Sequence, residues 1–309
     1  MKKRTQSIGR AVPLLAAVLL FSSCGRDGKR PAEVNPVPNS APAPATNIPE
    51  PVPAPAPEPA TPPPRPEINR DHAPALPPTP VGLVFHGDRS QPRAAITFDA
   101  CQTEKPAWFD EEIWKVLVDR EVKATIFLGG RWMEAHPEET RMIGQNPLIE
   151  IGNHSYIHPD FTRVSEERIR EELEATQDIM WRKLGRQGVT FRFPYGYYDE
   201  RSLAVVAELG LYPIQWDVVS GDPSKKVTAR AMTKRVLAET QNGSIIIFHI
   251  NGRGWNTGEA LPAIVDGLRS RGFELVTVSE LMGYEHPPQT SIPAWERALL
   301  DDRSETSAR

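Results

Sequence analysis

The sequence predicts an α/β domain in which about seven parallel strands form a barrel or near-barrel. Short apolar runs alternate along the chain with amphipathic stretches, and the links between them are short. Alternating strands and helices of this kind are typical of a parallel sheet covered by helices. The predicted strands are Ala94–Phe98, Ala124–Leu128, Leu148–Ile151, Val189–Phe193, Tyr212–Trp216, Ser244–Phe248 and Glu274–Val278.

Six amphipathic stretches between these strands are predicted to be helices. The clearest is the third, where Ile169, Leu173 and Ile179 fall on one side and charged residues on the other. Ser165 precedes it as a candidate N-cap. The predicted helices are Phe109–Arg120, Trp132–Ile143, Glu166–Leu184, Glu200–Leu209, Ala229–Thr240 and Gly258–Arg271.

Residues 1–23 have the pattern of a secretory signal peptide. A positively charged start is followed by the apolar run Ala11–Phe21, which is too short to span a bilayer as a stable helix. Ser22 and Ser23 then precede Cys24, which resembles the lipobox of bacterial lipoproteins, where the cysteine is acylated. We expect an exported protein of the bacterial cell envelope, anchored through a lipid on Cys24 to the outer membrane or the outer face of the cell membrane. A plain signal peptide with an incidental cysteine is the alternative.

Residues 24–80 are expected to form a disordered, proline-rich tether. Of the 32 prolines in the chain, 19 lie between Pro31 and Pro80, which also explains an apolar fraction of only 39%. Every second residue of 49–59 lacks the N–H that a helix or sheet needs. Extended polyproline geometry would give residues 31–80 a reach of about 150 Å. The remaining chain divides into a folded domain at 81–285 and a polar tail at 286–309.

The charge and cysteine content narrow the class of protein. The net charge is −4, and no Lys/Arg run follows the first ten residues. The chain therefore lacks the basic patch by which nucleic-acid-binding proteins are recognised. The chain contains two cysteines, and acylation of Cys24 would leave Cys101 without a disulfide partner. The oligomeric state stays open.

Ionisable side chains gather at the carboxyl ends of five predicted strands. In a parallel barrel these ends share one face, where such folds place their active sites. This regular placement is the strongest indication of an active site in the sequence. The residues are Asp99, His154 and His158, Arg192 and Tyr195, Asp217 and Asp222, and His249.

The His-x-x-x-His pair of His154 and His158 can hold one metal ion between two imidazoles. Hydrogen bonding of both rings within a loop is the alternative interpretation. The preceding strand and its Gly-Asn ending favour the metal site, because they place the pair in a loop at a strand end. Asp99 and His249 are interpreted as an acid–base pair, one taking a proton from water and the other giving one to the leaving nitrogen.

Five motifs follow one another in order: Thr97-Phe-Asp99, Gly152-Asn-His154-Ser-Tyr-Ile-His158, Arg192-Phe-Pro-Tyr195, Trp216 with Asp222, and Phe248-His249. Together they resemble the polysaccharide deacetylase family, the NodB-homology carbohydrate esterases of family 4, across residues 81–283. The resemblance implies a distorted (β/α) barrel and a divalent metal, usually Zn²⁺. It also implies removal of acetyl groups from N-acetylated or O-acetylated sugars.

The same resemblance implies a role for each candidate residue. It implies Asp99 as catalytic base, His154 and His158 as metal ligands, Arg192 as the residue that orients the base, the main-chain N–H of Tyr195 as an oxyanion donor, Asp222 as the residue that tunes the acid, and His249 as the acid itself.

One position departs from the family pattern. The first motif of the family reads Thr-Phe-Asp-Asp-Gly, and its second Asp is a metal ligand, whereas Ala100 stands there in this chain. The coordination of the metal could be completed in three ways. Additional water could join the two histidines, Asp99 could bind the metal, or Cys101 or Glu104 could bind it. We favour the first two, because a neighbouring side chain at a strand end points away as often as toward the site. Pro223 also replaces an aromatic residue of the fourth motif, which predicts a different sugar-binding groove.

The expected function is metal-dependent removal of N-acetyl groups from an extracytoplasmic polysaccharide of the peptidoglycan or poly-N-acetylglucosamine type. The expected partners are this acetylated polysaccharide and the membrane. A catalytically impaired glycan-binding lipoprotein on the same fold is one alternative, favoured by Ala100. Retention of the acid–base residues argues against it, because sugar binding does not require them. An O-acetyl esterase is the other alternative.

Overall fold

The computed structural model describes residues 73–103 and 107–285. The strands of these residues form one parallel sheet in the order β5-β4-β3-β2-β1-β7-β6, and β8 pairs with the start of β1. The strands are β1 (Arg93–Ala100), β2 (Ala124–Leu128), β3 (Ile149–Asn153), β4 (Thr190–Phe191), β5 (Tyr212–Pro213), β6 (Val218–Val219), β7 (Ser244–His249) and β8 (Glu274–Leu275).

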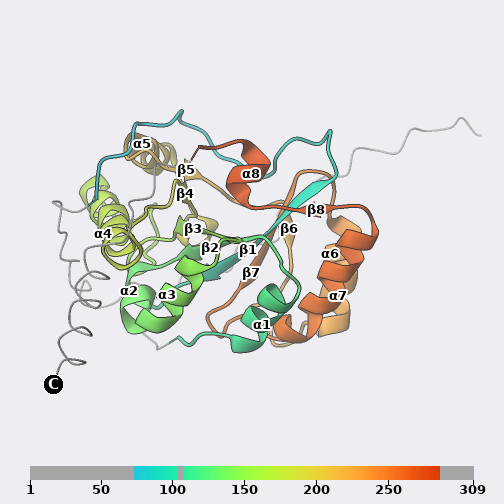
Figure 1. The fold of residues 1–309 in the computed structure, drawn as a ribbon. Coiled ribbons are helices and arrows are strands. Elements are labelled where there is room, and N and C mark those ends of the chain that lie inside the picture. Colours follow the sequence, from blue (N-terminus) through green and yellow to red (C-terminus); the bar gives the residue numbers. More distant parts are fainter. Residues whose placement is uncertain (1–72, 104–106, 286–309) are drawn as a thin grey trace, which may run out of the picture. The chain divides into compact units, whose positions relative to one another are not determined.

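The seven-strand path curls into a half-barrel with helices on its outside (Figure 1). Helices α1, α6 and α7 pack together along one part of the sheet, and α2 to α5 pack along another. This arrangement confirms the predicted α/β fold, a distorted barrel with about seven parallel strands. The helices are α1 (Glu111–Asp119), α2 (Gly130–Ala135), α3 (Pro137–Gln145), α4 (Glu166–Leu184), α5 (Glu200–Glu208), α6 (Ala229–Glu239), α7 (Thr257–Ser270) and α8 (Val278–Met282), with a 3-10 turn at Pro194–Gly196.

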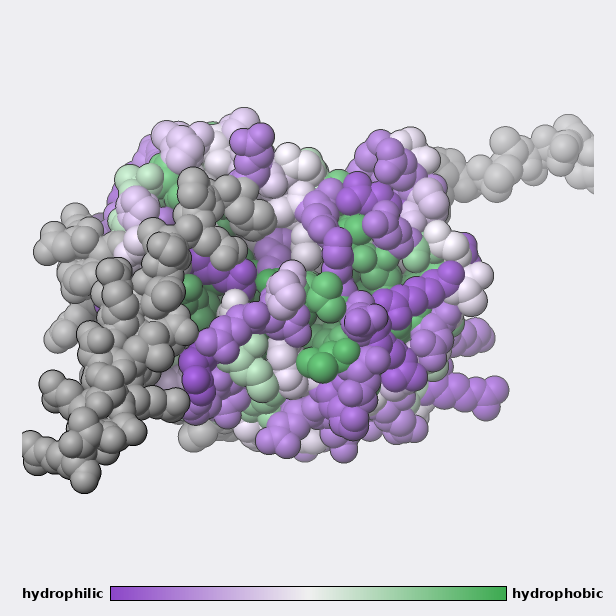
Figure 2. All heavy atoms as spheres, viewed as in Figure 1, coloured by the Kyte–Doolittle hydropathy of each residue, from purple (hydrophilic) through white to green (hydrophobic). Residues whose placement is uncertain are grey.

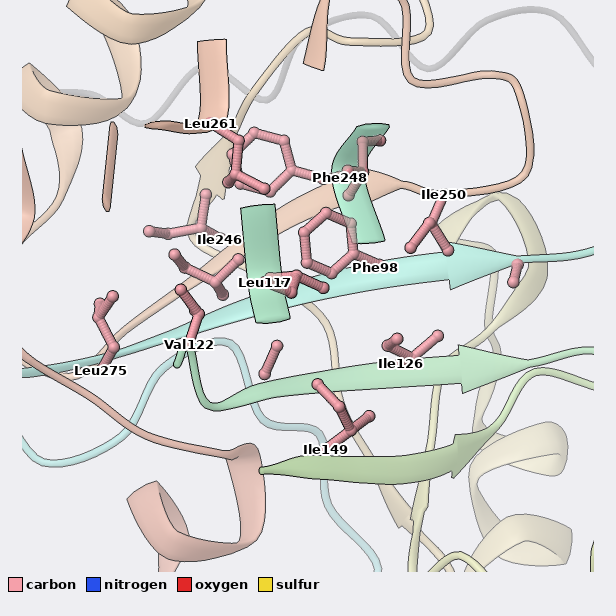
Figure 3. Packing of buried hydrophobic residues seen from close by; sticks show 14 of the residues in the cluster. Phe98, Leu117, Val122, Ile126, Ile149, Ile246, Phe248, Ile250, Leu261 and Leu275 are labelled. Carbon is pink, nitrogen blue, oxygen red and sulfur yellow. The ribbon is translucent and has the colours of Figure 1, made fainter. Parts of the chain in front are cut away.

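The outer face of the sheet packs against the helices through alternate residues of each strand. Phe98 of β1 and Phe248 of β7 stack with ring centroids 5.6 Å apart, close to Ile126 of β2 and Leu261 of α7 (Figure 3). These side chains are fully buried, and each such burial stabilises the fold by about 1.5–3 kcal/mol. The outer face therefore supplies most of the apolar core.

The inner face carries the intervening residues of the same strands. Ala95, Phe127 and Ile245 form a second buried cluster there with Leu281 of α8. Further along β1, the inner face changes from apolar to polar at Thr97. The interior of the half-barrel thus has an apolar floor and a polar region toward the carboxyl ends of the strands.

Four predicted elements differ from the structure, the first being the strand predicted over Val189–Phe193, of which only Thr190–Phe191 is a strand. The helix predicted over Trp132–Ile143 is two helices, α2 and α3, because Pro137 cannot continue the first and instead begins the second. The strand predicted over Glu274–Val278 ends at Leu275, since Thr277 caps α8. The strand predicted over Tyr212–Trp216 covers only its first two residues, and the short β6 was not predicted.

Helix α4 has the predicted bounds. Its N-terminus is capped by Ser165, whose side chain accepts a hydrogen bond from the N–H of Arg168. It ends at Gly185, which adopts the left-handed conformation (φ 66°). The local signals at both ends thus fix this helix, which lies directly outside the loop that carries the two histidines.

The last eight residues of the predicted tether, 73–80, lie against the domain. The N–H of Thr79 donates to the carbonyl of Ala207 at 2.9 Å, and its hydroxyl donates to Leu211 at 2.9 Å. Leu76 packs against the apolar cluster beside α5. The predicted signal peptide, Cys24 and the predicted tail at 286–309 lie outside the described residues.

The surface of the described domain is mostly hydrophilic on the face shown in Figure 2, and apolar residues show through between the polar ones. No helix within residues 73–103 or 107–285 combines the length and the apolar character needed to cross a membrane.

Candidate active site

Asp99 and His249 lie side by side at the carboxyl ends of β1 and β7, where they are register partners. Alternate residues of a strand share a face, so the next pair along the same inner face is Cys101 and Asn251. The amide of Asn251 donates to the carbonyl of Cys101 at 2.7 Å and to its Sγ at 3.4 Å. Two successive polar pairs therefore line the top of the half-barrel.

Arg192 is fully buried in the site, with no exposed surface. One guanidinium nitrogen donates to Asp99 at 2.9 Å and to Thr97 at 2.8 Å, and the other donors reach the carbonyls of Ile214 and Gln215. The guanidinium carbon lies 4.1 Å from the ring centre of Phe127. These contacts fix Arg192 and, through it, the orientation of the Asp99 carboxylate.

The environment of Asp99 keeps its carboxylate ionised. Burial acts to raise its pKa, but electrostatic interactions with His154, Arg192 and His249 and the hydrogen bond from Arg192 outweigh burial and hold the pKa below its ordinary value. The oxygen that does not bind Arg192 lies 3.5 Å from Nε2 of His154. An ionised, oriented carboxylate in this position has the properties of a general base.

His154 and His158 approach each other with ring centroids 4.8 Å apart. Nδ1 of His154 lies 2.9 Å from the carbonyl of Arg192 and donates to it, which directs Nε2 toward the interior of the site. Burial lowers the pKa of both histidines, most strongly that of His158. Both imidazoles are therefore neutral at neutral pH, the form that binds metal ions.

The backbone around the histidines is conformationally strained. Five non-glycine residues of the described chain have positive φ, and three of them belong to this region: Ser155 (61°), His158 (66°) and Tyr195 (58°). Such conformations cost of order 1–3 kcal/mol each and concentrate at functional sites. The strain supports the interpretation of this loop as a functional element.

Cys101, His154 and His158 form a cluster suited to a metal ion. All three are buried, and their potential ligand atoms lie within 4.8 Å of one another. One sulfur and two nitrogens with a fourth position left over match the donor set of catalytic zinc sites. Cys101, which the sequence did not favour as a ligand, lies with the two histidines, because it follows Asp99 by two residues and so shares its face. Glu104, the other candidate, lies outside the described residues.

His249 is paired with Asp222 in the manner expected of a tuned acid. Nδ1 of His249 donates to one oxygen of Asp222 at 2.9 Å, and its main-chain N–H donates to the other at 2.7 Å. Burial acts to lower the pKa of His249, but the charge and hydrogen bond of Asp222, helped by Asp99, raise it above its ordinary value. The protonated form of His249 is thus stabilised relative to that of an ordinary histidine.

Of the remaining candidates, Tyr195 belongs to the site and Asp217 does not. The Tyr195 ring lies edge-on to that of His158, with centroids 4.4 Å apart, and the side chain is 44% exposed. Asp217 instead binds Arg89 at 2.7 Å and the N–H of Ile245 at 2.8 Å. A strand-end position alone therefore does not place a residue in the site.

The structure adds two residues to the site that the sequence did not indicate. Asn251 holds Cys101, and its position two residues after His249 was the available signal. Glu172 of α4 is fully buried and accepts hydrogen bonds from the N–H groups of Tyr156 and Ile157 at 2.7 and 2.8 Å. It thereby fixes the loop between the two histidines, a role that its place in an amphipathic helix did not reveal.

Comparison with known proteins decides the family. Residues 86–214 match the family described as polysaccharide deacetylase. A peptidoglycan-N-acetylglucosamine deacetylase of Bacillus cereus is 32% identical over 199 residues, covering 64% of this chain and 70% of that protein. The chain belongs to the polysaccharide deacetylase family. It spans 63% of YlxY, an uncharacterized relative from Bacillus subtilis.

Solved structures of this deacetylase family include both active and inactive members. The crystal structure of a peptidoglycan N-acetylglucosamine deacetylase, Bc1960, superposes with a TM-score of 0.62 at 29% identity, covering 67% of this chain and 95% of that one. A CE4 family pseudoenzyme from Bacillus anthracis has a TM-score of 0.59 at 25% identity, covering 65% and 69%. A mutant of that pseudoenzyme is described as having restored enzymatic activity. Membership of the family alone therefore does not establish activity.

Proposed function

We propose that this protein is a metal-dependent hydrolase that removes N-acetyl groups from an extracytoplasmic polysaccharide of the peptidoglycan or poly-N-acetylglucosamine type. The observation that carries the proposal is the register pairing of Asp99 with His249 beside the cluster of buried histidines. Metal-assisted amide hydrolysis requires a general base and a general acid beside a metal ion. Asp99, held by Arg192, and His249, held by Asp222, would supply the base and the acid next to the metal-binding cluster. The likeness to peptidoglycan-N-acetylglucosamine deacetylases supports the choice of substrate.

In this proposal His154 and His158 hold a divalent metal ion, Zn²⁺ in the first instance. The bound ion would supply Lewis-acid activation of the acetyl carbonyl. Asp99 takes one proton from the attacking water, and Arg192 keeps its carboxylate aligned for that transfer. The main-chain N–H of Tyr195 donates to the oxygen on which negative charge develops.

His249 completes the reaction as general acid. It gives its Nε2 proton to the departing sugar nitrogen as the carbon–nitrogen bond breaks, so the products are acetate and a free amine on the sugar. The bond from Nδ1 to Asp222 stabilises the protonated imidazole before this transfer. The two protonation states required, an ionised Asp99 and a protonated His249, agree with the opposite directions of their pKa shifts.

We further propose that the protein acts in the bacterial cell envelope as a lipoprotein. The signal-peptide pattern and the small residues before Cys24 support export and acylation. A proline-rich tether over 24–80 would let the domain reach a polymer away from its membrane. Palmitate labelling that is lost in Cys24→Ala is the expected result, and labelling that persists would refute the anchor.

A second candidate function is glycan binding without catalysis. It is favoured by Ala100, which stands where the family has a metal-binding Asp, and by the likeness to a CE4 pseudoenzyme. The arrangement of Asp99 and His249 favours catalysis instead, since a binding protein has no need of a tuned acid and base.

Acetate release distinguishes these functions. The purified protein, supplied with Zn²⁺, is incubated with peptidoglycan, with N-acetylglucosamine oligomers and with an O-acetylated xylan. Release from the N-acetylated substrates is expected, and Asp99→Asn should reduce it by at least about 100-fold. Release from the xylan alone would support the esterase. Glycan binding without release from any substrate would support the binding protein.

A further inference from the structure

We infer that the thiolate of Cys101 is the third protein ligand of the metal, which makes this a Cys-His-His site where the family pattern has a carboxylate. The inference rests on the metal-binding part of the proposed function. It gives the metal a third protein ligand although Ala100 replaces the metal-binding Asp of the family pattern. That substitution by itself suggests a weakened metal site.

The strand geometry separates Ala100 from Cys101. Ala100 is fully buried in the outer-face core with Phe98 and Leu128, so a side chain at this position points toward the helices. Asp99 and Cys101 lie on the opposite, inner face, where the histidines are. In this chain, Cys101 therefore lies with the histidines and Ala100 lies in the core.

The side chain of Asp99 is engaged elsewhere. One of its oxygens accepts the charge-assisted bond from Arg192, and the carboxylate is needed as the free base. Cys101 has no such competing ion pair and is buried, with 4% of the residue exposed. Among the described residues, the sulfur is the donor that completes a three-ligand cluster with the two histidines.

His158 gives independent support for an ion in this cluster. Its Nδ1 is buried and has no hydrogen-bond partner within the described part of the chain. The side chain as a whole is about nine-tenths buried, with 7% of its surface exposed. An unpaired buried nitrogen is costly, and such exceptions call for an explanation such as an ion. A metal bound to Nδ1 of His158, beside Cys101, would remove that cost.

Asn251 has the contacts of a residue that positions the thiolate. Its amide donates both to the carbonyl and to the Sγ of Cys101, and only 1% of the residue is exposed. N–H donors to a ligating atom orient it and are commonly required for full metal affinity. Because Asn251 follows His249 by two residues, the same strand orients both the ligand and the general acid.

A thiolate ligand also predicts which metal is bound. Soft sulfur donors favour Zn²⁺ over Mg²⁺, Ca²⁺ and Mn²⁺, which prefer carboxylate and carbonyl oxygens. With three protein ligands, one position stays open for water or substrate, as in other catalytic zinc sites. The site is therefore expected to select zinc more strongly than a site built with a carboxylate.

Cobalt substitution tests the sulfur ligand directly. The full chain carrying Cys24→Ser, in which Cys101 is the only thiol, is loaded with Co²⁺ and its absorption spectrum is recorded. A thiolate-to-cobalt charge-transfer band in the near ultraviolet is expected, and Cys101→Ser should abolish it while circular dichroism stays unchanged. Asp99→Asn should keep the band. A spectrum without this band, or one that Cys101→Ser leaves unchanged, would overturn the inference.

Two further measurements cover the case in which a variant folds poorly. In the Cys24→Ser chain, Zn²⁺ should slow alkylation of Cys101 at least tenfold, and His154→Ala should remove this protection. Asn251→Leu should weaken zinc binding by about 10–100-fold while the cobalt band remains, because it removes a positioning contact and no ligand. Equal alkylation rates with and without Zn²⁺ would count against a bound sulfur.

Acetate release from the same samples separates this inference from the proposed function. A cobalt band without acetate release would leave the sulfur ligand standing and reject the hydrolase. If Cys101→Ser releases acetate and keeps its full zinc content, the hydrolase is supported and the sulfur ligand is rejected.

Discussion

The main-chain carbonyl of Arg192 accepts the hydrogen bond of His154 Nδ1 at 2.9 Å, while the side chain of the same arginine donates to Asp99 at 2.9 Å. One residue thus orients both Asp99, the proposed base, and His154, the first proposed metal ligand. The two functions are carried by different parts of Arg192, its backbone and its guanidinium, and can be separated by mutation.

Arg192→Lys should impair catalysis without removing the metal. A lysine ammonium cannot reproduce the planar set of donors that reaches Asp99, Thr97 and two carbonyls, so the carboxylate loses its alignment. We expect kcat/KM to fall by about 100-fold, the scale of a misplaced catalytic group. Metal content, measured by elemental analysis, should stay at the wild-type level because the carbonyl that holds His154 remains. Loss of metal in parallel with activity would contradict this division of roles.

Asp222→Asn should narrow the pH range of activity on its alkaline side. The reaction needs protonated His249, so activity declines as pH rises through the pKa of His249, which Asp222 raises. Removing the negative charge lowers that pKa and moves the alkaline limb of the kcat/KM profile to lower pH. Asp217→Asn is the matched control, since Asp217 binds Arg89 and should leave the limb in place. An alkaline limb unaffected by Asp222→Asn would exclude His249 as the acid.

The acid limb of the same profile should lie below the ordinary range for aspartate. Asp99 must be ionised to act as base, and the surrounding histidines and Arg192 lower its pKa. Activity is therefore expected to persist as pH falls toward the ordinary pKa of aspartate and to be lost only beneath it, provided that metal remains bound. The measurement is kcat/KM under saturating Zn²⁺. An acid limb that stays in place in Asp99→Asn, measured on residual activity, would assign it to another group.

The sequence was sufficient for the parts of the fold and site that follow from periodicity. Strand ends carrying Asp99, His154, Arg192 and His249 could be recognised because a parallel barrel gathers such ends on one face. Helix α4 could be bounded because its caps are local signals. The short strands β5 and β6 could not, since their pairing depends on neighbours distant in the chain.

The contacts that support the site were less accessible to sequence reasoning. Whether Cys101 faces the histidines depends on how far β1 continues, and the strand continues through Ala100. In the sequence, Glu172 resembles any polar residue of an amphipathic helix. Its role depends on its hydrogen bonds to the loop between the two histidines, which only the tertiary structure shows. Such roles are decided by tertiary packing, which a local pattern does not encode.

Glu172→Ala should loosen the histidine loop. The substitution removes the acceptor of two main-chain N–H groups and the partner of Arg168, so buried donors lose their bonds. We expect a loss of stability of roughly 2–3 kcal/mol and weaker zinc binding. Glu172→Gln, which keeps one acceptor oxygen, should lose less of both. Denaturant unfolding and zinc titration provide the measurements. Equal effects of the two substitutions would argue against the hydrogen bonds as the cause.

Metal removal should lower the thermal stability of the domain, and this can be measured without any substrate. A ligand that binds only the folded state stabilises it by about 2.7 kcal/mol when present at 100 times its Kd. For a domain of about 200 residues, that corresponds to a Tm higher by roughly 5–10 °C with zinc than with a chelator. The effect should diminish as pH falls, because protons compete with the metal for the histidines. His154→Ala and His158→Ala should each lose most of the response, whereas Asp217→Asn should keep it. A Tm that does not respond to zinc in the wild-type protein, with the other folded-state signals intact, would show that these histidines hold no metal.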